Sequence, residues 1–422
     1  SPFSLALELR NPTLMRMSVS GHQQDAGQAS DVVGAICTRE GRRMSEVGLT
    51  VMPADRVAGG SIPGLDRTKL AMGSVAFLLL TVGIFWYQFQ RIQIGDGGPG
   101  WNQLRWGYFL LLLLALPIET VTSGLRVWLL CRVLQPGVGL WTCFKAEWAN
   151  VAIAMLTPSQ SGGGPGQIYM LSRGGANVGT ALTISLLSFA GTMVSLLCMG
   201  LYSLLVSSIE PTGPLFAGAV WALTSISAAM LLGAIWPGLF RVVLSAISRA
   251  RHRMQGGSFP LHDWWRPGHD RTGPAVDRMG RVTARLVDIL YAYRDDVRRF
   301  LRCGKATFAW VCLLSLVFLF SRCLIPYLCI RFLGIETSSL RGVIEVQMAL
   351  IFLVFFAPTP GGAGVAEGAS LSIMANIVPV GFAPYYNLLW RFSTLYLAAI
   401  AGLFCLLRAL VQDAQQVLHK AG

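Results

Sequence analysis

The sequence predicts an all-α polytopic membrane protein with about six full spans and two re-entrant helical hairpins, arranged as an inverted-topology repeat. Of its 422 residues, 53% are hydrophobic and only 13% are charged, whereas soluble domains carry about 25% charged residues. Apolar runs recur along the chain, and each is long enough to cross the roughly 30 Å hydrocarbon layer as a helix. Two further apolar stretches end in matching clusters of Pro and Gly.

Residues 1–66 contain no long apolar run and are rich in glycine and polar residues. Such a segment cannot bury enough apolar surface to fold alone, so we expect it to be disordered. Residues 67–410 form the predicted transmembrane domain, with halves at about 107–206 and 306–408. A basic loop, 238–305, joins the halves, and 411–422 form a short tail.

Six apolar segments are each expected to span the membrane once: 70–89, 107–131, 180–206, 215–237, 306–332 and 384–408. Two other stretches, 141–156 and 340–357, run into a Pro/Gly cluster and then a short helical piece. We interpret both as re-entrant hairpins, although for 340–357 a full span is the alternative.

The charge of the basic loop 238–305 predicts the orientation of the protein in the membrane. It carries fourteen basic residues against six acidic ones, and Lys and Arg favour cytoplasmic loops. Counting spans outward from this loop also places both termini in the cytoplasm. The net charge of +13 therefore fits orientation signals beside apolar spans better than a nucleic-acid surface.

An amphipathic helix is expected near the end of that loop, because apolar residues recur there every three or four positions. They are Met279, Val282, Leu286, Ile289, Tyr293, Val297 and Phe300. The helix either lies on an anionic leaflet or packs on the cytoplasmic side of the bundle.

The two Pro/Gly clusters align without a gap at an offset of 200 residues. Identical residues stand at Pro158 and Pro358, Gly162 and Gly362, and Gly164 and Gly364, while Gln167 matches Glu367. By the predicted orientation, the first hairpin is entered from the cytoplasm and the second from outside. The two halves are therefore expected to be inverted copies, as in many transporters.

These clusters predict a site because Pro lacks an N–H and Gly favours non-helical angles, which leaves peptide groups unpaired at membrane depth. Such groups are tolerated where they line a cavity or face protein. Helices that begin after the glycines would point their positive ends at an anionic group such as a lipid phosphate. The alternative is that the breaks are packing kinks.

Ionisable residues inside spans are costly and normally face a cavity or a partner. Glu119 and Arg126 share a helix face, so they either pair with each other or serve a site. Arg391 could hold a phosphate through its guanidinium, and Arg322 could do the same or pair with a carboxylate. For Glu367, a gating role and capping of its own helix are both open.

Three polar residues stand nearer the hairpin entrances, where a solvated position explains them: Glu147, Glu345 and Gln347. The histidines lie outside the spans without metal-ligand spacing, and the glycine clusters lack the Lys of a nucleotide-binding loop. We therefore expect no catalytic residues, no metal and no cofactor.

The cluster at 358–364, followed by Glu367 and then Arg391, resembles the signature of the lysylphosphatidylglycerol synthase transmembrane, flippase-like family. In the first half, Arg126 and the cluster at 158–167 support the resemblance, which covers about residues 70–410. It implies a bacterial inner-membrane protein with re-entrant hairpins around a lipid cavity. It also implies a stand-alone member, because the chain has no soluble aminoacyl-transfer domain.

The leading interpretation is a lipid flippase or transporter that moves an anionic or modified lipid between leaflets of the membrane, and the sequence favours a transporter over an enzyme. The predicted substrate-binding or gating residues are Pro158, Gly162, Gly164, Gln167, Pro358, Gly361, Gly362, Gly364, Glu367, Arg391, Arg126 and Glu119. Expected partners are membrane lipids with anionic headgroups, with a soluble lipid-modifying enzyme and oligomers as further options. The alternative is a membrane transferase or an accessory subunit of a glycosyltransferase that acts on a lipid-linked substrate.

Overall fold

A computed structural model describes residues 67–90, 100–157, 162–206, 218, 221, 225, 278–336, 339–355 and 357–421. In these ranges the regular elements are all helices, so the expected all-α fold is confirmed. The predicted disordered segment 1–66 lies outside the described residues. So does the predicted span 215–237, apart from three positions.

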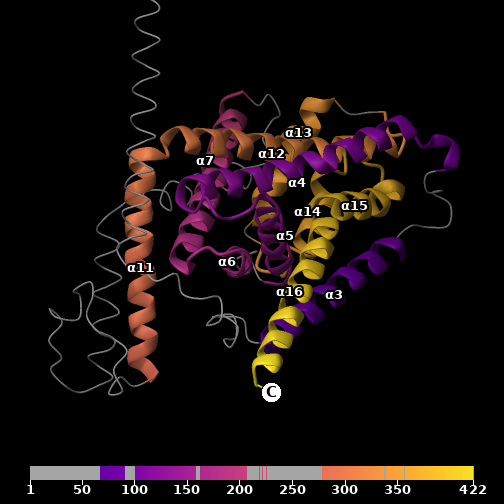
Figure 1. Ribbon diagram of the computed structural model, residues 1–422. Coiled ribbons are helices and arrows are strands. Elements are labelled where there is room, and N and C mark those ends of the chain that lie inside the picture. The colour runs from indigo at the N-terminus through magenta and orange to yellow at the C-terminus, as the bar shows by residue number, and fades with distance from the viewer. Residues whose placement is uncertain are drawn as a thin grey trace, which may run out of the picture. The chain divides into compact units, whose positions relative to one another are not determined.

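The helices follow the predicted segments closely (Figure 1). The first half contains α3 (Arg67–Gln90), the 3-10 turn η2 (Trp101–Gln103), α4 (Trp106–Leu134), α5 (Leu140–Leu156), α6 (Gly163–Arg173) and α7 (Val178–Val206). The second half contains α11 (Arg278–Cys303), α12 (Lys305–Phe332), α13 (Leu340–Phe355), α14 (Val365–Ile373), the 3-10 turn η3 (Val380–Phe382), α15 (Ala383–Arg391), the π-helical turn η4 (Phe392–Tyr396) and α16 (Leu397–Ala421).

Four stretches of the described residues are long and apolar enough to cross a membrane. They are Trp106–Leu134, Val178–Tyr202, Lys305–Phe332 and Val380–Gln416, and they coincide with four of the six predicted spans. The predicted span 70–89 forms the helix α3, but this helix is not among these four stretches. The structure thus supports a membrane protein, and the count of six spans stays a prediction.

The helices α4 and α12 pack along each other and join the two halves (Figure 1). They run in opposite directions, because the N–H of Arg105 at the start of α4 donates to the carbonyl of Phe332 at the end of α12 over 2.9 Å. Two of the apolar cores contain residues of both halves. One core joins α4, α5, α6 and α7 to α11, α12 and α16, and the other joins α12, α13, α14 and α15 to α4.

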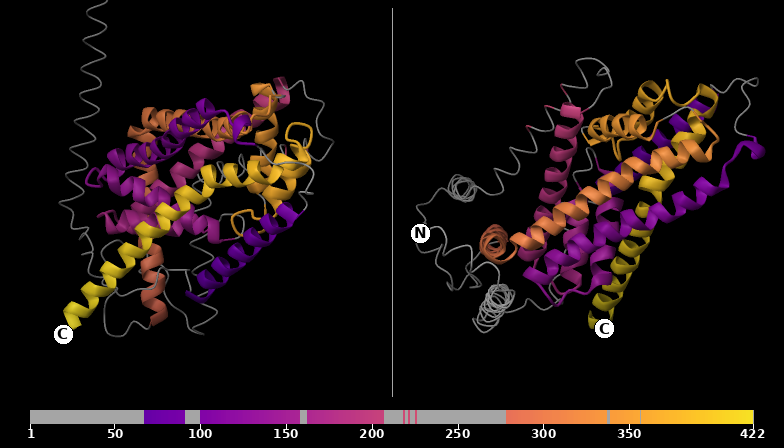
Figure 2. Two further views of the ribbon diagram at one scale, coloured as in Figure 1. Left: turned by 90° about the vertical axis from the view of Figure 1, so that its right-hand side faces the viewer. Right: turned by 90° about the horizontal axis from the view of Figure 1, so that it is seen from above.

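The predicted amphipathic helix forms as α11 and lies across the direction of α12 in both figures (Figures 1 and 2). It packs on α7, where a Cβ on Gly179 would stand only 2.5 Å from the Cβ of Ala292. Phe300 near its end is buried in the first core. Packing on the bundle is therefore observed, and contact with a leaflet stays a prediction.

Candidate functional site

The first break separates α5 from α6, and we call residues 140–173 the first hairpin. Pro158 and the residues up to 161 lie outside the described chain. The glycines of α6 serve close packing. A Cβ on Gly163 would lie 1.9 Å from the Asn150 side-chain oxygen, and one on Gly166 would lie 2.8 Å from the Ala149 carbonyl oxygen. Since both contacts are with α5, these glycines let the two helices touch.

The second break separates α13 from α14, and we call residues 340–373 the second hairpin. Here Gly361, Gly362 and Gly364 have φ values of +60°, +68° and +86°. These angles belong to the left-handed region, which glycine enters without steric cost. The expectation that the glycines take non-helical angles is confirmed at these three positions.

A buried ion pair organises the second break. The Nε of Arg391 donates to Glu367 over 2.7 Å, and its two terminal nitrogens donate to the carbonyls of Gly361 and Gly362. The other oxygen of Glu367 accepts the N–H of Gly364 over 2.7 Å, which caps α14. Glu367 is therefore both a helix cap and an arginine partner, and the break's exposed peptide groups are satisfied by protein.

The chain becomes a π-helix immediately after Arg391. The turn spans Phe392–Tyr396 and joins α15 to α16 in one continuous stretch. Such insertions widen a helix locally and often occur at functional sites. Within this turn, the carbonyl of Thr394 accepts a hydrogen bond from Arg322 of α12 over 3.3 Å.

A second buried ion pair lies at the first hairpin, between Arg126 of α4 and Glu147 of α5, at 3.1 Å. Gln167 of α6 donates to the same Glu147 oxygen over 3.4 Å and accepts from Ser185 over 2.6 Å. The remaining contacts of Arg126 are with hydroxyl groups on α7 and α12, at Thr192 and Ser315. One guanidinium thus connects three other helices with a network of polar side chains.

Two interpretations of the ionisable residues change with the structure. Glu119 does not pair with Arg126; it lies 3.6 Å from Arg322 of α12. Arg322 therefore has a carboxylate partner. The ion pair joins α4 to α12 and does not lie within one helix, because the antiparallel contact of the two helices brings Glu119 close to Arg322.

The expected solvated position of the entrance residues was wrong. Glu147, Glu345 and Gln347 are 4%, 6% and 1% exposed. Glu345 is bonded to Arg341 over 2.9 Å, whereas the side-chain oxygen of Gln347 has no partner among the described residues. These side chains lie inside the bundle because α5 and α13 pack on neighbouring helices along their length.

Acid and amide have exchanged places between the two hairpins. At the offset of 200, Glu147 matches Gln347 on the first helix of each hairpin, and Gln167 matches Glu367 on the second. The arginine also differs, since Arg126 precedes its hairpin and Arg391 follows it. The alignment of the two glycine clusters at this offset, extended backwards along the chain, pairs Glu147 with Gln347. It would have revealed Glu147 as a site residue from the sequence.

The two ion pairs are linked through α12. The Cζ atoms of Arg126 and Arg322 each lie 5.7 Å from the centre of the Phe318 ring, within the range of cation–π attraction. Arg322 in turn reaches Thr394, three residues beyond Arg391. Side-chain contacts therefore run from Arg126 at the first hairpin to Arg322, which bonds the backbone of the π-turn after Arg391.

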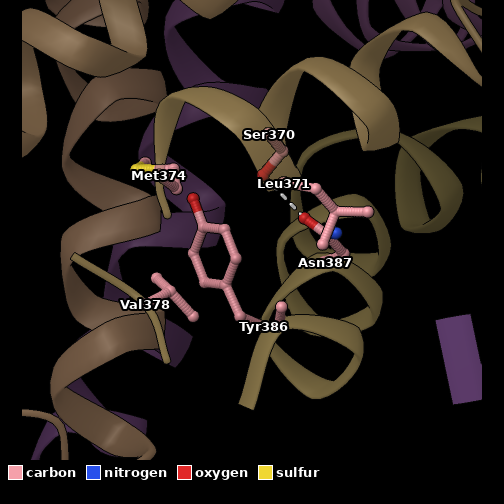
Figure 3. A pocket seen from close by; sticks show the side chains of 7 residues that line it. Ser370, Leu371, Met374, Val378, Tyr386 and Asn387 are labelled. Carbon is pink, nitrogen blue, oxygen red and sulfur yellow. Dashed lines mark hydrogen bonds between the residues drawn. The ribbon is translucent and has the colours of Figure 1, made fainter. Parts of the chain in front are cut away.

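A small cavity lies beside the second hairpin between α14 and α15 (Figure 3). Ser370 donates to Asn387 over 2.7 Å, and Asn387 donates to Gln88 of α3 over 3.3 Å. The Tyr386 hydroxyl points toward Met374 and has no partner among the described residues. The lining is mostly apolar, and a cavity of this size has room for a water molecule at most, not for a lipid headgroup.

Comparison with known proteins decides the family. The model of the lysylphosphatidylglycerol synthase TM region matches residues 74–402. The chain belongs to this family. Among curated proteins and solved structures, none matches the chain.

Membership of the lysylphosphatidylglycerol synthase TM region family confirms the resemblance seen in the sequence and supports a membrane protein with a lipid-related function. The matched residues include both hairpins and every ion pair described above, since they extend from α3 to the beginning of α16.

Proposed function

We propose that this protein is a lipid flippase or lipid transporter that moves an anionic or modified phospholipid between the leaflets of a bacterial inner membrane. Two matched helix breaks with buried arginine–carboxylate pairs carry the proposal. The family supports a lipid-related role, and the buried arginine at each break supplies the kind of donor that a phosphate headgroup needs at membrane depth.

The inverted repeat is part of this proposal. Matching helices α4 and α12 pack in opposite directions, and each is followed by a hairpin at the same offset. This arrangement fits a symmetry axis in the membrane plane, with the hairpins entering from opposite sides. The basic loop then lies in the cytoplasm together with both termini.

The Arg391–Glu367 pair is the proposed headgroup site. The pair is neutral as a whole, so it can remain buried in an apolar bundle. Each of the three nitrogens of Arg391 donates one hydrogen bond, to Glu367 or to the break's carbonyls. A lipid phosphate would therefore replace Glu367 as the arginine's partner, and Glu367 would recover it when the lipid leaves.

Reconstitution tests the proposal. Purified protein is placed in phosphatidylglycerol vesicles with a trace of fluorescent phospholipid, and a reductant that cannot cross the bilayer bleaches the outer leaflet. A flippase makes the inner-leaflet label accessible, whereas protein-free vesicles keep it. The neutral double variant Arg391→Gln with Glu367→Gln should abolish the extra bleaching.

The matched control is Arg105→Gln, which removes an exposed ion pair with Glu336 away from the hairpins. It should bleach like the original protein. If the original protein moves no phosphatidylglycerol, phosphatidylethanolamine or aminoacylated phosphatidylglycerol, the proposal is wrong.

A further inference from the structure

The cavity between α14 and α15 has a buried hydroxyl group at its wall (Figure 3). This group belongs to Tyr386, which is only 1% exposed. The hydroxyl points toward Met374 and has no hydrogen-bond partner among the described residues. Because burial of a hydroxyl without a hydrogen bond costs free energy, such groups are rarely left unpaired. Tyr386 therefore requires a partner that the cavity can admit.

The size and charge of the cavity restrict this partner. The cavity has a volume of about 10 Å³ open to the centre of a water molecule, and one water needs about 10–15 Å³ by this measure. None of the seven residues that line the cavity is charged. An ion would therefore lose its hydration without gaining an opposite charge. Both limits favour a single neutral molecule of the size of water.

The lining supplies further partners for a water molecule. The hydroxyl of Ser370 donates to Asn387 over 2.7 Å, which leaves its own oxygen able to accept a hydrogen bond. One amide N–H of Asn387 donates to Gln88 over 3.3 Å, and the amide has a second N–H to donate. With the hydroxyl of Tyr386, the cavity therefore offers the roughly three hydrogen bonds that a buried water makes.

We propose that this cavity is a binding site for one water molecule, held by Tyr386, Ser370 and Asn387 where α14 meets α15. The inference does not depend on the proposed flippase function. Ser370 follows Glu367 by three residues on α14, and Asn387 precedes Arg391 by four residues on α15. The water therefore lies about one helical turn from the buried ion pair and braces the two helices that carry it.

The water also supports the contact with α3. Gln88 is 4% exposed, and its side-chain oxygen accepts the hydrogen bond from Asn387. An asparagine amide has donors on one side and an acceptor on the other, so its orientation depends on its partners. A water that accepts from the second N–H of Asn387 holds the amide in the orientation that reaches α3.

Radiolytic labelling tests the site. The full chain in phosphatidylglycerol nanodiscs is exposed to X-rays for milliseconds, which turns water into hydroxyl radicals in place, and oxidised residues are identified by mass spectrometry. Met374 lines the cavity, whereas Met193 belongs to a separate apolar core, and both are 1% exposed. We expect Met374 to be oxidised about fivefold faster than Met193, because only Met374 has water beside it. Equal rates would show that the cavity is dry and would overturn the inference.

Tyr386→Phe removes the hydroxyl and keeps the ring. The oxidation rate of Met374 should fall about threefold toward the rate of Met193, because the water loses one of its three partners. The rate of Met193 should stay the same. If Met374 is oxidised as fast as in the original protein, Tyr386 does not hold the water and the assignment is wrong.

The melting temperature of the same variant gives a difference in sign. Where water completes the hydroxyl, Tyr386→Phe loses a hydrogen bond and should lower the melting temperature in detergent by about 1–3 °C. In a dry cavity the hydroxyl would be an unpaired buried group, so its removal should raise the melting temperature. A rise would therefore contradict the inference.

Tyr385→Phe is the matched control. Tyr385 is the preceding residue of α15, but it does not line the cavity, and its ring packs against Phe89 with the centroids 5.5 Å apart. This variant should keep the oxidation rate of Met374 and change the melting temperature by less than about 1 °C. If it slows the oxidation of Met374 as much as Tyr386→Phe does, the cause is a general change in α15, and the water site at Tyr386 is refuted.

Discussion

In the first hairpin the glycines bring two helices into contact, whereas in the second they let the backbone turn left-handed. Gly163 and Gly166 of α6 approach backbone or side-chain atoms of α5. Gly362 and Gly364 instead have positive φ values. The aligned pair Gly162 and Gly362 also differs, with φ values of −83° and +68°, so an aligned glycine does not imply the same geometry.

The two hairpins also differ in how they are held. At the first, α16 passes so close to α5 that a Cβ on Gly402 would lie 1.9 Å from the carbonyl oxygen of Trp148. Asp413 of α16 accepts hydrogen bonds from Tyr169 and Arg173 at the end of α6. At the second, Arg391 of the following helix α15 donates to the break's own carbonyls. The first break is thus flanked by contacts with α16, whereas the second is bonded directly by a side chain of α15.

The largest expected difference concerns the two carboxylates. Glu367→Gln should destabilise the protein by about 3–5 kcal/mol, because it leaves buried Arg391 unpaired and weakens the cap at Gly364. Glu147→Gln should cost about half as much, since each arginine keeps two other hydrogen bonds but Glu147 lies inside α5 and caps no helix. Thermal unfolding in detergent measures both. Equal losses of stability would show that the two carboxylates contribute equally to the fold, contrary to this prediction.

The glycines on the second helices of the hairpins should respond with opposite signs. Gly166→Ala in α6 should destabilise by about 1–3 kcal/mol, because its Cβ would lie 2.8 Å from the Ala149 carbonyl oxygen. Gly368→Ala in α14 meets nothing within 4 Å and should stabilise by about 0.5–1 kcal/mol through helix propensity. The comparison fails if both substitutions shift the melting temperature in the same direction.

The aligned glycines 162 and 362 should differ in whether a second substitution restores the stability that is lost when the glycine is replaced by alanine. Gly362→Ala places a side chain at φ +68° and should cost about 1–2 kcal/mol. Adding Val354→Ala removes the contact at 2.8 Å but not the strained φ, so stability should not return.

At Gly162 the φ is −83°, and the nearest atom to an added Cβ is the Thr157 methyl at 2.4 Å. Adding Thr157→Ser to Gly162→Ala should therefore restore part of the loss. Melting curves of the four variants show whether the obstacle is a side chain or the backbone. If Val354→Ala restored the stability of Gly362→Ala, the loss would come from the side-chain contact and not from the backbone φ, which would contradict this prediction.

The smallest expected effect is a pH dependence at the contact of α11 with α7. Burial raises the pKa of Asp296 on α11 from 3.8 to about 6, partly offset by its hydrogen bond with Thr180 at the start of α7. A raised folded pKa favours the neutral carboxyl, so this contribution to stability is full below about pH 4 and is lost as pH rises through about 6. The contact of α11 with α7 should therefore be tighter in acid.

Asp296→Asn should remove this dependence, shrinking the change in melting temperature between pH 5 and pH 7.5 by about 1–3 °C. Hydrogen exchange of α11 at the two pH values locates the effect. A variant that keeps the full pH dependence would show that another group titrates.

Sequence alone determined the membrane class, the helices α3, α4, α7 and α12, and the offset of 200 between the breaks. These are local properties. Apolar length and the positions of Pro and Gly set where helices can begin and end, whatever the partners are.

Only the tertiary structure decided which charges pair. Arg126 and Glu147 are 21 residues apart, and Arg391 and Glu367 are 24 apart, so no helix periodicity brings them together. The pairing of Glu119 with Arg322 depends on the antiparallel contact of α4 and α12. The π-turn after Arg391 and the left-handed glycines are likewise set by packing, because several backbone conformations suit the same residues until their neighbours select one.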